Sequence, residues 1–433
     1  MKRIFHIGVG NFFRAHQAAF TQGLAGWEIV GASLRSPHMA KMLASQGGSY
    51  TLAVKDRSGT KFQKIDVLKD VLVAPQNPDA VLQMIAEPAI AIVTITVTEN
   101  GYCLAPDGTL DLSHDEVAQD LATGTAVTLP ALLARGLERR WLAKAGPITV
   151  MSCDNLPENG RKLAAAVTAF AKATGMELAA FSPDFVRFPN AMVDRITPAT
   201  TDALRQEVAE QTGWVDAAPV ETEAFAEWVI EDRFAGPRPA WESAGAQFVS
   251  EVAPFEMRKL RMLNGAHSYL AYAGQLAGHT YVHEAIADQA LRADVQALFE
   301  AAQATLPPAS AQDAVAYGQS LLTRFENPGL KHALAQIAMD GSLKIPIRWG
   351  GLIGTNAGEA VMCKGLAAWV IWVWGVIQNG DTLADPAAER IAKICAAADD
   401  AAAAAVPLLD LIASGIDRPD LGRMVQETVR RAL

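Results

Sequence analysis

A basic segment near the middle of the chain carries the side chains best suited to chemistry. Residues 256–267 contain no proline and are expected to form a helix. At about 100° per residue, Lys259, Asn264 and His267 fall on one flank, and the rise from the lysine to the histidine is roughly 12 Å. A buried lysine can carry a proton near neutral pH, while an amide and an imidazole can hold an alkoxide or carbonyl oxygen. This set suits alcohol–ketone interconversion without a metal, although spacing alone more often describes a helix with solvated basic residues.

The first residues have the pattern of a dinucleotide-binding turn. A short apolar strand is followed by Gly8, Gly10 and an expected helix. Gly8 would allow a tight turn, and Gly10 would let backbone N–H groups approach a pyrophosphate at the start of that helix. Phe13 replaces the third glycine of the pattern, so an ordinary strand-to-helix turn is the alternative. The position directly after the first strand favours dinucleotide binding.

Both segments resemble signatures of the mannitol dehydrogenase family, the long-chain polyol dehydrogenases that also include hexuronate reductases. Five further segments resemble the same family in the same order, at residues 94–102, 151–157, 188–198, 227–232 and 339–346. The resemblance runs from residue 3 to about residue 350. It implies an α/β Rossmann-type N-terminal domain followed by an all-α C-terminal domain. It also implies a metal-independent, NAD(P)-dependent oxidoreductase for a sugar alcohol, such as mannitol or arabinitol, and its ketose.

The resemblance assigns catalytic roles to individual residues. Lys259 would be the general base in alcohol oxidation and the general acid in ketone reduction. Asn264 and His267 would bind the reacting oxygen, with Asn190 as a further partner; taken alone, Asn190 also fits a turn amide. Glu256 would pass the proton between Lys259 and solvent, or it would form a helical salt bridge with a nearby basic residue.

The substrate contacts leave two substrate classes open. Lys344 matches the family's substrate-binding lysine, and Asp194 of the 188–198 segment is expected in the same site. Gln336 stands where polyol dehydrogenases carry an arginine, and it is more similar to the hexuronate reductase branch. Lys344 and Arg348 could hold a carboxylate, or they could be two solvated basic residues at a loop. The alternative substrate is therefore a keto-uronate of the fructuronate type.

The expected cofactor is NAD, with NADP left open. The residues expected to contact it are Gly8, Gly10, Asn11, Phe12, Arg35, Thr98 and Glu99. An NAD-selective fold normally has an acidic residue after its second strand. Here the loop is Ser33-Leu34-Arg35-Ser36-Pro37-His38, and Arg35 and His38 could tolerate a phosphate.

Composition excludes some other classes of protein. The chain has 433 residues and a net charge of −10, which argues against a nucleic-acid binder but permits an acidic substrate held by a local basic cluster. The four cysteines have neither metal-ligand spacing nor a disulfide framework, and His279 and His283 lack a third ligand, so no metal site is expected. The apolar run at residues 365–377 is shorter than the roughly 20 residues that span a bilayer. Because the first strand begins at about residue 3, no signal peptide is expected, and we expect a cytoplasmic monomer.

The elements that position these residues change in kind along the chain. Apolar runs predict strands at Ile4–Val9, Trp27–Ser33, Ala89–Val97 and Pro147–Ser152, alternating with helices, which indicates a parallel sheet covered on both faces. Strands fade after about residue 250, so we expect a dinucleotide-binding domain at residues 1–250 and a helical substrate-binding domain at 251–433. The alanine-rich run at 397–405 is expected to be helical. An idle dinucleotide-binding sensor is the alternative of another class, and the intact lysine, asparagine and histidine set argues against it.

Overall fold

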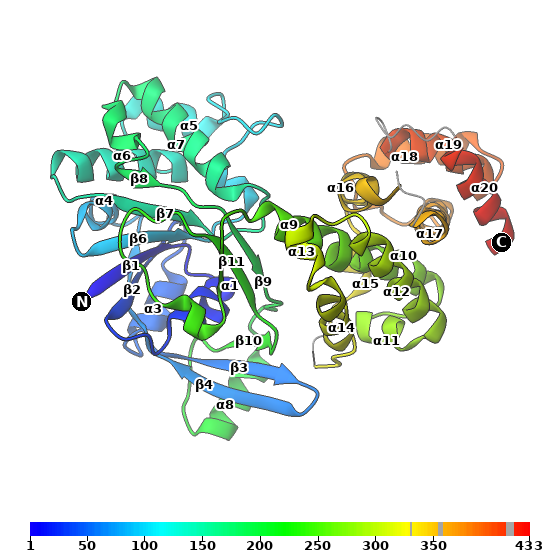
Figure 1. The fold of residues 1–433 in the computed structure, drawn as a ribbon, viewed down its shortest axis with the longest axis horizontal. Helices are drawn as coiled ribbons and strands as arrows, with labels where there is room; N and C mark the ends of the chain where they lie inside the picture. The colour runs from blue at the N-terminus through cyan, green and yellow to red at the C-terminus, as the bar shows by residue number, and fades with distance from the viewer. Residues whose placement is uncertain (330, 354–357, 413–419) are drawn as a thin grey trace. The chain divides into compact units, whose positions relative to one another are not determined.

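The chain divides into two compact units, Met1–Ala253 and Pro254–Leu433. The computed structural model describes residues 1–329, 331–353, 358–412 and 420–433. The first unit contains strands and helices, and the described residues of the second contain helices but no strand (Figure 1). The predicted fold class, a Rossmann-type domain followed by a helical domain, is confirmed.

A six-stranded parallel sheet forms the middle of the first unit. Its order is β5-β2-β1-β6-β7-β8. The strands are β1 (Lys2–Ile7), β2 (Trp27–Ser33), β5 (Leu68–Val73), β6 (Ile90–Ile95), β7 (Ile148–Ser152) and β8 (Val186–Arg187). Every residue of β6 and β7 is buried, as expected for parallel strands that are covered on both faces. All four predicted strands are therefore present, with ends shifted by at most two residues.

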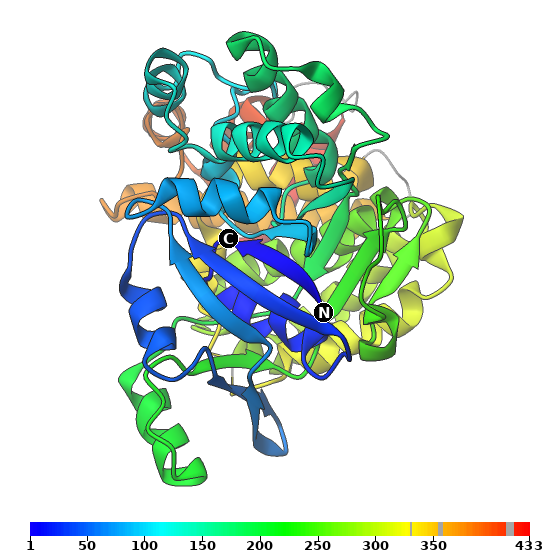
Figure 2. The same cartoon turned by 90° about the vertical axis from the view of Figure 1, so that its left-hand side faces the viewer.

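Helices cover both faces of this sheet (Figures 1 and 2). One face is packed by α4 (Pro78–Ala86), α5 (Asp115–Thr123), α6 (Leu129–Leu142) and α7 (Asn159–Thr174), in a core that includes Val81, Leu133 and Val167. The other face packs against α1 (Asn11–Ala15), α2 (Gln17–Thr21) and α3 (His38–Ala44), together with Trp228 and Trp241. The glycine turn thus joins a buried strand to a short helix on the second face.

Two small sheets in the first unit were not predicted. One has the order β10-β3-β4, and the other has the order β12-β11-β9. Their strands are β3 (Tyr50–Asp56), β4 (Gly59–Ile65), β9 (Ala191–Asp194), β10 (Val220–Glu223), β11 (Glu227–Glu231) and β12 (Gln247–Val249). The β3–β4 hairpin and α8 (Asp202–Thr212) project on the side opposite α6 and α7 (Figure 2). None of these strands has more than three apolar residues in a row, and β4 is mostly polar and exposed, so they lack the apolar runs that predict buried strands.

The second unit is built from helices of very different length. They are α9 (Ala253–Lys259), α10 (Gly265–Leu276), α11 (Val282–Ala287), α12 (Gln289–Gln303), α13 (Pro308–Ala311), α14 (Ala314–Phe325), α15 (Leu334–Ala338), α16 (Gly341–Ile353), α17 (Glu359–Gln378), α18 (Ala388–Ala397), α19 (Ala401–Ile412) and α20 (Leu421–Ala432). A π-helical turn, η4 (Leu260–Asn264), joins α9 directly to α10. The predicted lysine helix is therefore present, but it is not a regular α-helix.

The longest apolar helix, α17, is longer than the predicted apolar run. Its 20 residues are long and apolar enough to cross a bilayer by length and composition alone. Its most apolar window is 56% buried inside the structure, and the helix packs against α10, α19 and α20. The core helix of a helical domain has these same properties.

The alanine-rich run is interrupted where continuous helix was predicted. Helix α18 ends at Ala397 and α19 begins at Ala401. Asp400 lies in the break, and its Oδ1 accepts a hydrogen bond from the backbone N–H of Ala403 at 2.7 Å. Aspartate favours such helix-start positions over helix interiors, which explains the break.

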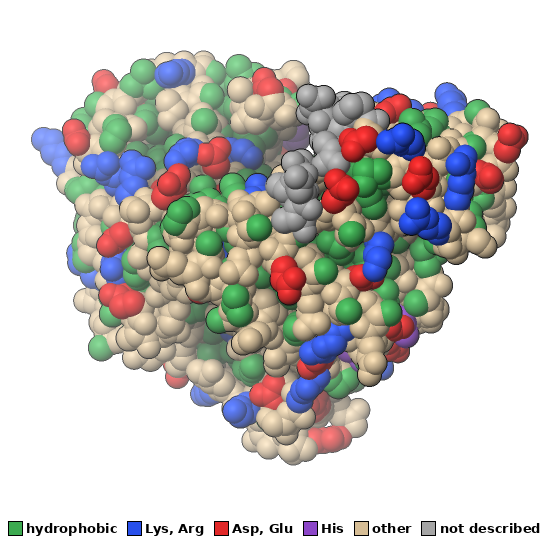
Figure 3. Space-filling view, turned by 45° about the vertical axis from the view of Figure 1, so that its right-hand side comes forward, with side chains coloured by type: hydrophobic (Ala, Val, Ile, Leu, Met, Phe, Trp, Pro, Cys, Tyr) green, Lys and Arg blue, Asp and Glu red, His purple; other side chains and the backbone are tan. Residues whose placement is uncertain are grey.

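The surface of the described residues carries both signs of charge. On the face shown in Figure 3, acidic and basic side chains are interspersed. On that face the described residues form no basic stripe of the kind that nucleic-acid binding requires.

Candidate active site

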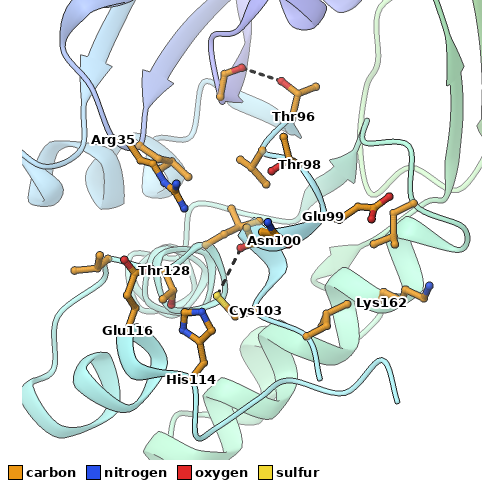
Figure 4. A pocket seen from close by; sticks show the side chains of 18 of the residues that line it. Arg35, Thr96, Thr98, Glu99, Asn100, Cys103, His114, Glu116, Thr128 and Lys162 are labelled. Atoms are coloured by element: carbon orange, nitrogen blue, oxygen red, sulfur yellow. Dashed lines mark hydrogen bonds between the residues drawn. The ribbon is translucent and has the colours of Figure 1, made fainter. Parts of the chain in front are cut away.

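A cavity of about 870 Å³ lies at the carboxyl ends of the central parallel strands. It is lined by residues 8–10 after β1, residues 33–36 at the end of β2 and residues 96–101 after β6, and further by residues of α5, α6 and α7 (Figure 4). Open α/β sheets bind ligands in the crevice outside the carboxyl ends of their strands. We therefore call this cavity the dinucleotide groove.

The two glycines of the turn have different structural roles. Gly8 has a φ of +101°, and a Cβ atom there would lie 1.9 Å from the carbonyl oxygen of Thr96. Its N–H donates to the carbonyl of Ala32 at 2.8 Å, which ties the turn to β2. A Cβ atom on Gly10 would meet no protein atom within 4 Å. Gly8 is thus required by the fold, while Gly10 leaves open space beside the chain, as a closely approaching pyrophosphate needs.

A buried histidine of β1 is hydrogen-bonded to the glycine turn. His6 Nε2 lies 3.1 Å from the carbonyl oxygen of Gly8, and its Nδ1 lies 2.8 Å from Thr94 Oγ1. Because a carbonyl only accepts, Nε2 carries the proton and Nδ1 accepts from the threonine. The ring stacks on Phe13 with centroids 3.6 Å apart. Burial lowers the pKa of His6 to about 3, so the ring is neutral at physiological pH. His6 was not predicted from the sequence.

Asp154 holds the loop that follows β6 on the wall of the groove. Thr98 in this loop has a φ of +72°, which is unusual for a residue other than glycine. The Asp154 carboxylate accepts from the N–H groups of Val97 and Thr98 at 3.0 and 3.1 Å, and from the Tyr102 hydroxyl at 2.6 Å. Burial raises the pKa of Asp154 above its usual range. Its place in the 151–157 segment was the only signal in the sequence.

Five of the seven residues expected to contact the cofactor line the dinucleotide groove, namely Gly8, Gly10, Arg35, Thr98 and Glu99. Asn11 and Phe12 are not among the lining residues. The Asn11 amide donates to the carbonyl of Pro198 at 3.0 Å. The Phe12 ring stacks on His16 with centroids 5.0 Å apart. Both side chains therefore contact other residues of the first unit and do not line the groove.

Asn190 and Asp194 also lie in the first unit. The Asn190 backbone N–H and Nδ2 donate to the Glu231 carboxylate at 3.1 and 2.9 Å. Its Oδ1 accepts from the backbone N–H of Arg161, at the start of α7, at 3.1 Å. Asp194 is buried on β9, where it pairs in register with Glu227 of β11. The carboxylate of Glu231 thus fixes the orientation of the Asn190 amide.

The lysine set lies in the second unit, around the π-helical turn. Lys259 ends α9, Asn264 ends η4, and His267 lies in the first turn of α10. Lys259 and His267 are buried, whereas Asn264 and Glu256 are half-buried. The predicted spacing of 100° per residue does not hold here, because the five residues of η4 follow the wider π-helical geometry. Such turns occur often at functional sites.

Helix α16 fixes the π-helical turn from the side. Arg348 donates to the carbonyl of Asn264 at 3.4 Å and to Ser268 Oγ at 2.8 Å. The indole N–H of Trp349 donates to the carbonyl of Gly265 at 3.1 Å. Arg348 therefore lies against the lysine helix and not in the solvated loop that was its alternative.

His267 is a neutral imidazole surrounded by positive charge. Burial, together with the charges of His332, Arg348, Arg324 and Lys259, lowers the pKa of His267 well below its usual range. Its ring packs against Phe325 and His332, with centroids 4.8 and 5.1 Å away. Within the described residues, Nε2 of His267 is buried and has no hydrogen-bond partner. Arg324 and His332 were not identified from the sequence.

The remaining substrate candidates are less buried. Gln336 is exposed on α15. Lys344 lies one helical turn before Arg348 on α16, and its Nζ donates to the carbonyl of Met339 at 2.6 Å and lies 3.5 Å from Asp340. Burial and the charge of Arg348 lower the pKa of Lys344. Lys344 and Arg348 thus share a face of α16.

No metal-binding group stands out in the part of the chain that the structure describes, where no three His, Cys, Asp or Glu side chains gather. His279 precedes α11 and lies 3.8 Å from Asp288. Cys153 is buried, and its burial raises its pKa, as expected of a structural thiol.

Two family models match the chain along almost its whole length. Residues 2–243 match the mannitol dehydrogenase Rossmann domain, and residues 251–433 match the mannitol dehydrogenase C-terminal domain. The chain belongs to the mannitol dehydrogenase family. The predicted family and enzyme class are confirmed, so the chain is an oxidoreductase of this family.

Relatives within the mannitol dehydrogenase family carry different names. The D-mannonate oxidoreductase of Escherichia coli is 39% identical, over 90% of this chain and 84% of the relative. A crystal structure of D-sorbitol dehydrogenase in substrate-free form superposes with a TM-score of 0.90 at 32% identity, covering 99% of this chain and 92% of the other. Pseudomonas fluorescens mannitol 2-dehydrogenase, in a ternary complex with NAD and D-mannitol, superposes with a TM-score of 0.80 at 34% identity, covering 99% and 91%.

Proposed function

We propose that this member of the mannitol dehydrogenase family is an NAD-dependent, metal-independent dehydrogenase of small polyhydroxy compounds. It interconverts a secondary alcohol of a mannitol- or arabinitol-like sugar alcohol with the ketone of the matching ketose. The observation that carries this proposal is the buried Lys259 next to a neutral His267 whose Nε2 has no partner among the described residues. A solvated basic helix, the alternative for this segment, would leave both side chains exposed.

The dinucleotide groove is the proposed site of the cofactor. The open space at Gly10 and the tight turn at Gly8 fit a pyrophosphate that lies close to the backbone. Thr98 and Glu99 line the same groove, and Asp154 fixes the loop that carries them. When bound, NAD accepts a hydride from the alcohol, and NADH supplies one to the ketone.

In the proposed mechanism Lys259 transfers the proton, and other polar side chains donate hydrogen bonds to the reacting oxygen. Lys259 takes the hydroxyl proton during oxidation and returns it during reduction. A neutral imidazole carries one N–H, so His267 donates a hydrogen bond to the oxygen without protonating it, and the Asn264 amide donates a second. Asn190 Nδ2 donates one of its two hydrogens to Glu231. Asn190 stays in the proposed set because the second hydrogen can be donated to the reacting oxygen. Glu256, one turn before Lys259 on α9, is proposed to pass the proton to solvent.

A hexuronate is the second candidate substrate, and the positive charge around His267 favours it. Arg324, Arg348 and Lys259 all act on this one imidazole. Lys344 adds a further charge beside Arg348 on α16. Such a cluster would attract a carboxylate through bidentate or charge-assisted hydrogen bonds. Sequence identity does not separate the two candidates, because a D-mannonate oxidoreductase and a mannitol 2-dehydrogenase are each 39% identical to the chain.

The deciding experiment follows NADH oxidation with fructose, xylulose, fructuronate and tagaturonate side by side. Turnover of the neutral ketoses supports the polyol proposal, and turnover confined to the uronates replaces it with the second candidate. Cofactor binding without turnover of any of the four substrates would contradict both enzyme proposals and favour the dinucleotide-binding sensor.

The role of Lys259 is tested with Lys259→Met against the matched variant Lys393→Met. Lys393 is exposed on α18 of the same unit. Loss of general acid–base catalysis lowers kcat by about 10²–10⁴-fold, with NADH binding retained. Equal kcat in the two variants would remove Lys259 from the proposed mechanism.

A further inference from the structure

The end of β2 places an arginine, and not an acid, beside the glycine turn. β1 and β2 are neighbouring parallel strands, with Ile7 paired to Ala32. In this fold the adenosine ribose binds where the second strand ends, and NAD-selective sites have an aspartate or glutamate there for the ribose hydroxyls. Here β2 ends at Ser33, and the next residues are Leu34, Arg35 and Ser36.

Arg35 is presented to the groove by a hydrogen-bonded turn. Ser33 Oγ donates to the carbonyl of Ser36 at 2.6 Å, and Ser36 Oγ accepts from the N–H of His38 at the start of α3 at 3.2 Å. The first bond closes the turn around Arg35, and the second joins that turn to the start of α3. Its side chain lines the groove and is exposed (Figure 4). Among the described residues it makes no hydrogen bond and no ion pair.

The acids that line the same groove come from other elements. Glu99 follows β6, and Glu116 belongs to α5. Figure 4 shows Glu116 on the same side of the pocket as Arg35, and Glu99 on the side of Lys162. Glu116 is exposed and is the one acid that could compete with Arg35 for the ribose among the described lining residues. No lining residue between Ser33 and Ser36 is acidic, so the loop itself offers no charge that would repel a phosphate.

We propose that the dinucleotide groove also accepts NADP(H), with the Arg35 guanidinium binding the ribose 2′-phosphate. The guanidinium offers a planar set of donors that matches two phosphate oxygens. The Ser36 hydroxyl accepts from the N–H of His38 and keeps its own hydrogen for the same phosphate, whereas the Ser33 hydroxyl already donates to the Ser36 carbonyl. The proposal rests on the proposed dehydrogenase function, because it takes the groove as the cofactor site, and it extends that function to a second cofactor.

The rival role for Arg35 is stacking on the adenine ring. A guanidinium plane stacks on aromatic faces, and it would then contribute equally to NADH and NADPH. Phosphate binding contributes only to NADPH. The ratio of the two affinities therefore separates the two roles.

The experiment measures binding and does not depend on turnover. The purified full chain is titrated with NADH and with NADPH by isothermal calorimetry, and bound NADH is competed with adenosine 2′,5′-bisphosphate and with 5′-AMP. The same titrations are made on Arg35→Gln and on Lys162→Gln, a matched loss of one positive charge on α7 of the same groove. Thermal melting verifies that both variants are folded.

We expect the wild-type chain to bind NADPH about as well as NADH, and the bisphosphate to compete better than 5′-AMP. Arg35→Gln should lower the ratio of NADPH to NADH affinity by about 10- to 100-fold, the loss typical of hydrogen bonds to a charged group. Lys162→Gln should leave that ratio unchanged. An equal loss for both dinucleotides in Arg35→Gln, or a wild-type chain that binds NADH but rejects NADPH, would overturn the proposal. A chain that binds neither dinucleotide would refute the proposed function, and this inference with it.

Discussion

Replacing each glycine of the turn by alanine should separate folding from cofactor binding. In Gly8→Ala the new Cβ atom would lie 1.9 Å from the carbonyl oxygen of Thr96, a backbone atom that cannot rotate away. The φ of +101° adds about 1–2 kcal/mol of strain for a residue with a side chain. Overpacking adds about 1–3 kcal/mol. The free energy of unfolding should therefore fall by about 2–5 kcal/mol, which lowers the melting temperature of a unit of this size by about 5–20 °C.

Gly10→Ala is the matched control with the opposite result. A Cβ atom at Gly10 meets no protein atom within 4 Å, and the residue is extended with a φ of −90°. Alanine then costs nothing in the folded state and restricts the unfolded chain, which stabilises by about 0.4–1 kcal/mol. The methyl group would fill the space proposed for the pyrophosphate, so NADH affinity should fall by about tenfold or more.

Calorimetric melting and NADH titration of both variants test this pair. A Gly8→Ala protein that melts like the wild type would mean that the turn does not pack against β6 as described. A Gly10→Ala protein with unchanged NADH affinity would move the dinucleotide away from this turn. Loss of stability in both variants would refute the division of roles.

His6 and Asp154 give two further predictions, one for the pH dependence of stability and one for stability together with NADH affinity. Because the folded pKa of His6 is about 3 against 6.5 unfolded, its stability contribution is complete above pH 6.5 and is lost as the pH falls from 6.5 toward 3. The loss should reach about 4–5 kcal/mol at most, seen as a steeper decline of urea-unfolding free energy in the wild type than in His6→Asn, and parallel declines would contradict it. Asp154→Ala should lower stability by about 1–3 kcal/mol through the unpaired N–H groups of Val97 and Thr98. NADH affinity should also weaken. An unchanged NADH affinity would show that the loop after β6 does not need its hydrogen bonds to Asp154.

Four of the six strands of the central sheet could be predicted from their apolar runs, whereas β5, which contains Lys69 and Asp70, and the two-residue β8 were not predicted. β2 was predicted to the residue, and β1, β6 and β7 within two residues. The β3–β4 hairpin could not be found in this way, because β4 is mostly exposed and polar and its pairing with β3 is set by tertiary context. The π-helical turn η4 leaves no mark in helical periodicity, since it changes the hydrogen-bond partner and not the residue types.

Residue type and spacing predicted the lining of the dinucleotide groove, where backbone conformation requires particular residues, better than the surroundings of His267. The groove is lined by Gly8 and Gly10, which were chosen because a turn beside a pyrophosphate needs them. Arg324 and His332 were missed because they come from a helix end and a loop more than 50 residues after Lys259, and nothing in the sequence marks them as neighbours of His267. Long-range clusters of this kind depend on helix packing, which the pattern of single helices does not determine.

Phe13 departs from the dinucleotide pattern, and its contacts explain why the fold tolerates this. A third glycine normally lets the helix approach the strand closely. Here α1 has only five residues, and the fully buried Phe13 ring stacks on His6 beneath the turn. Phe13→Gly would restore the usual pattern, but it would leave a cavity, so stability should fall by about 4–6 kcal/mol from lost packing and helix propensity. Urea unfolding measures this loss. A Phe13→Gly protein as stable as the wild type would show that the ring does not support the turn, and the neutral state of His6 would then need another cause.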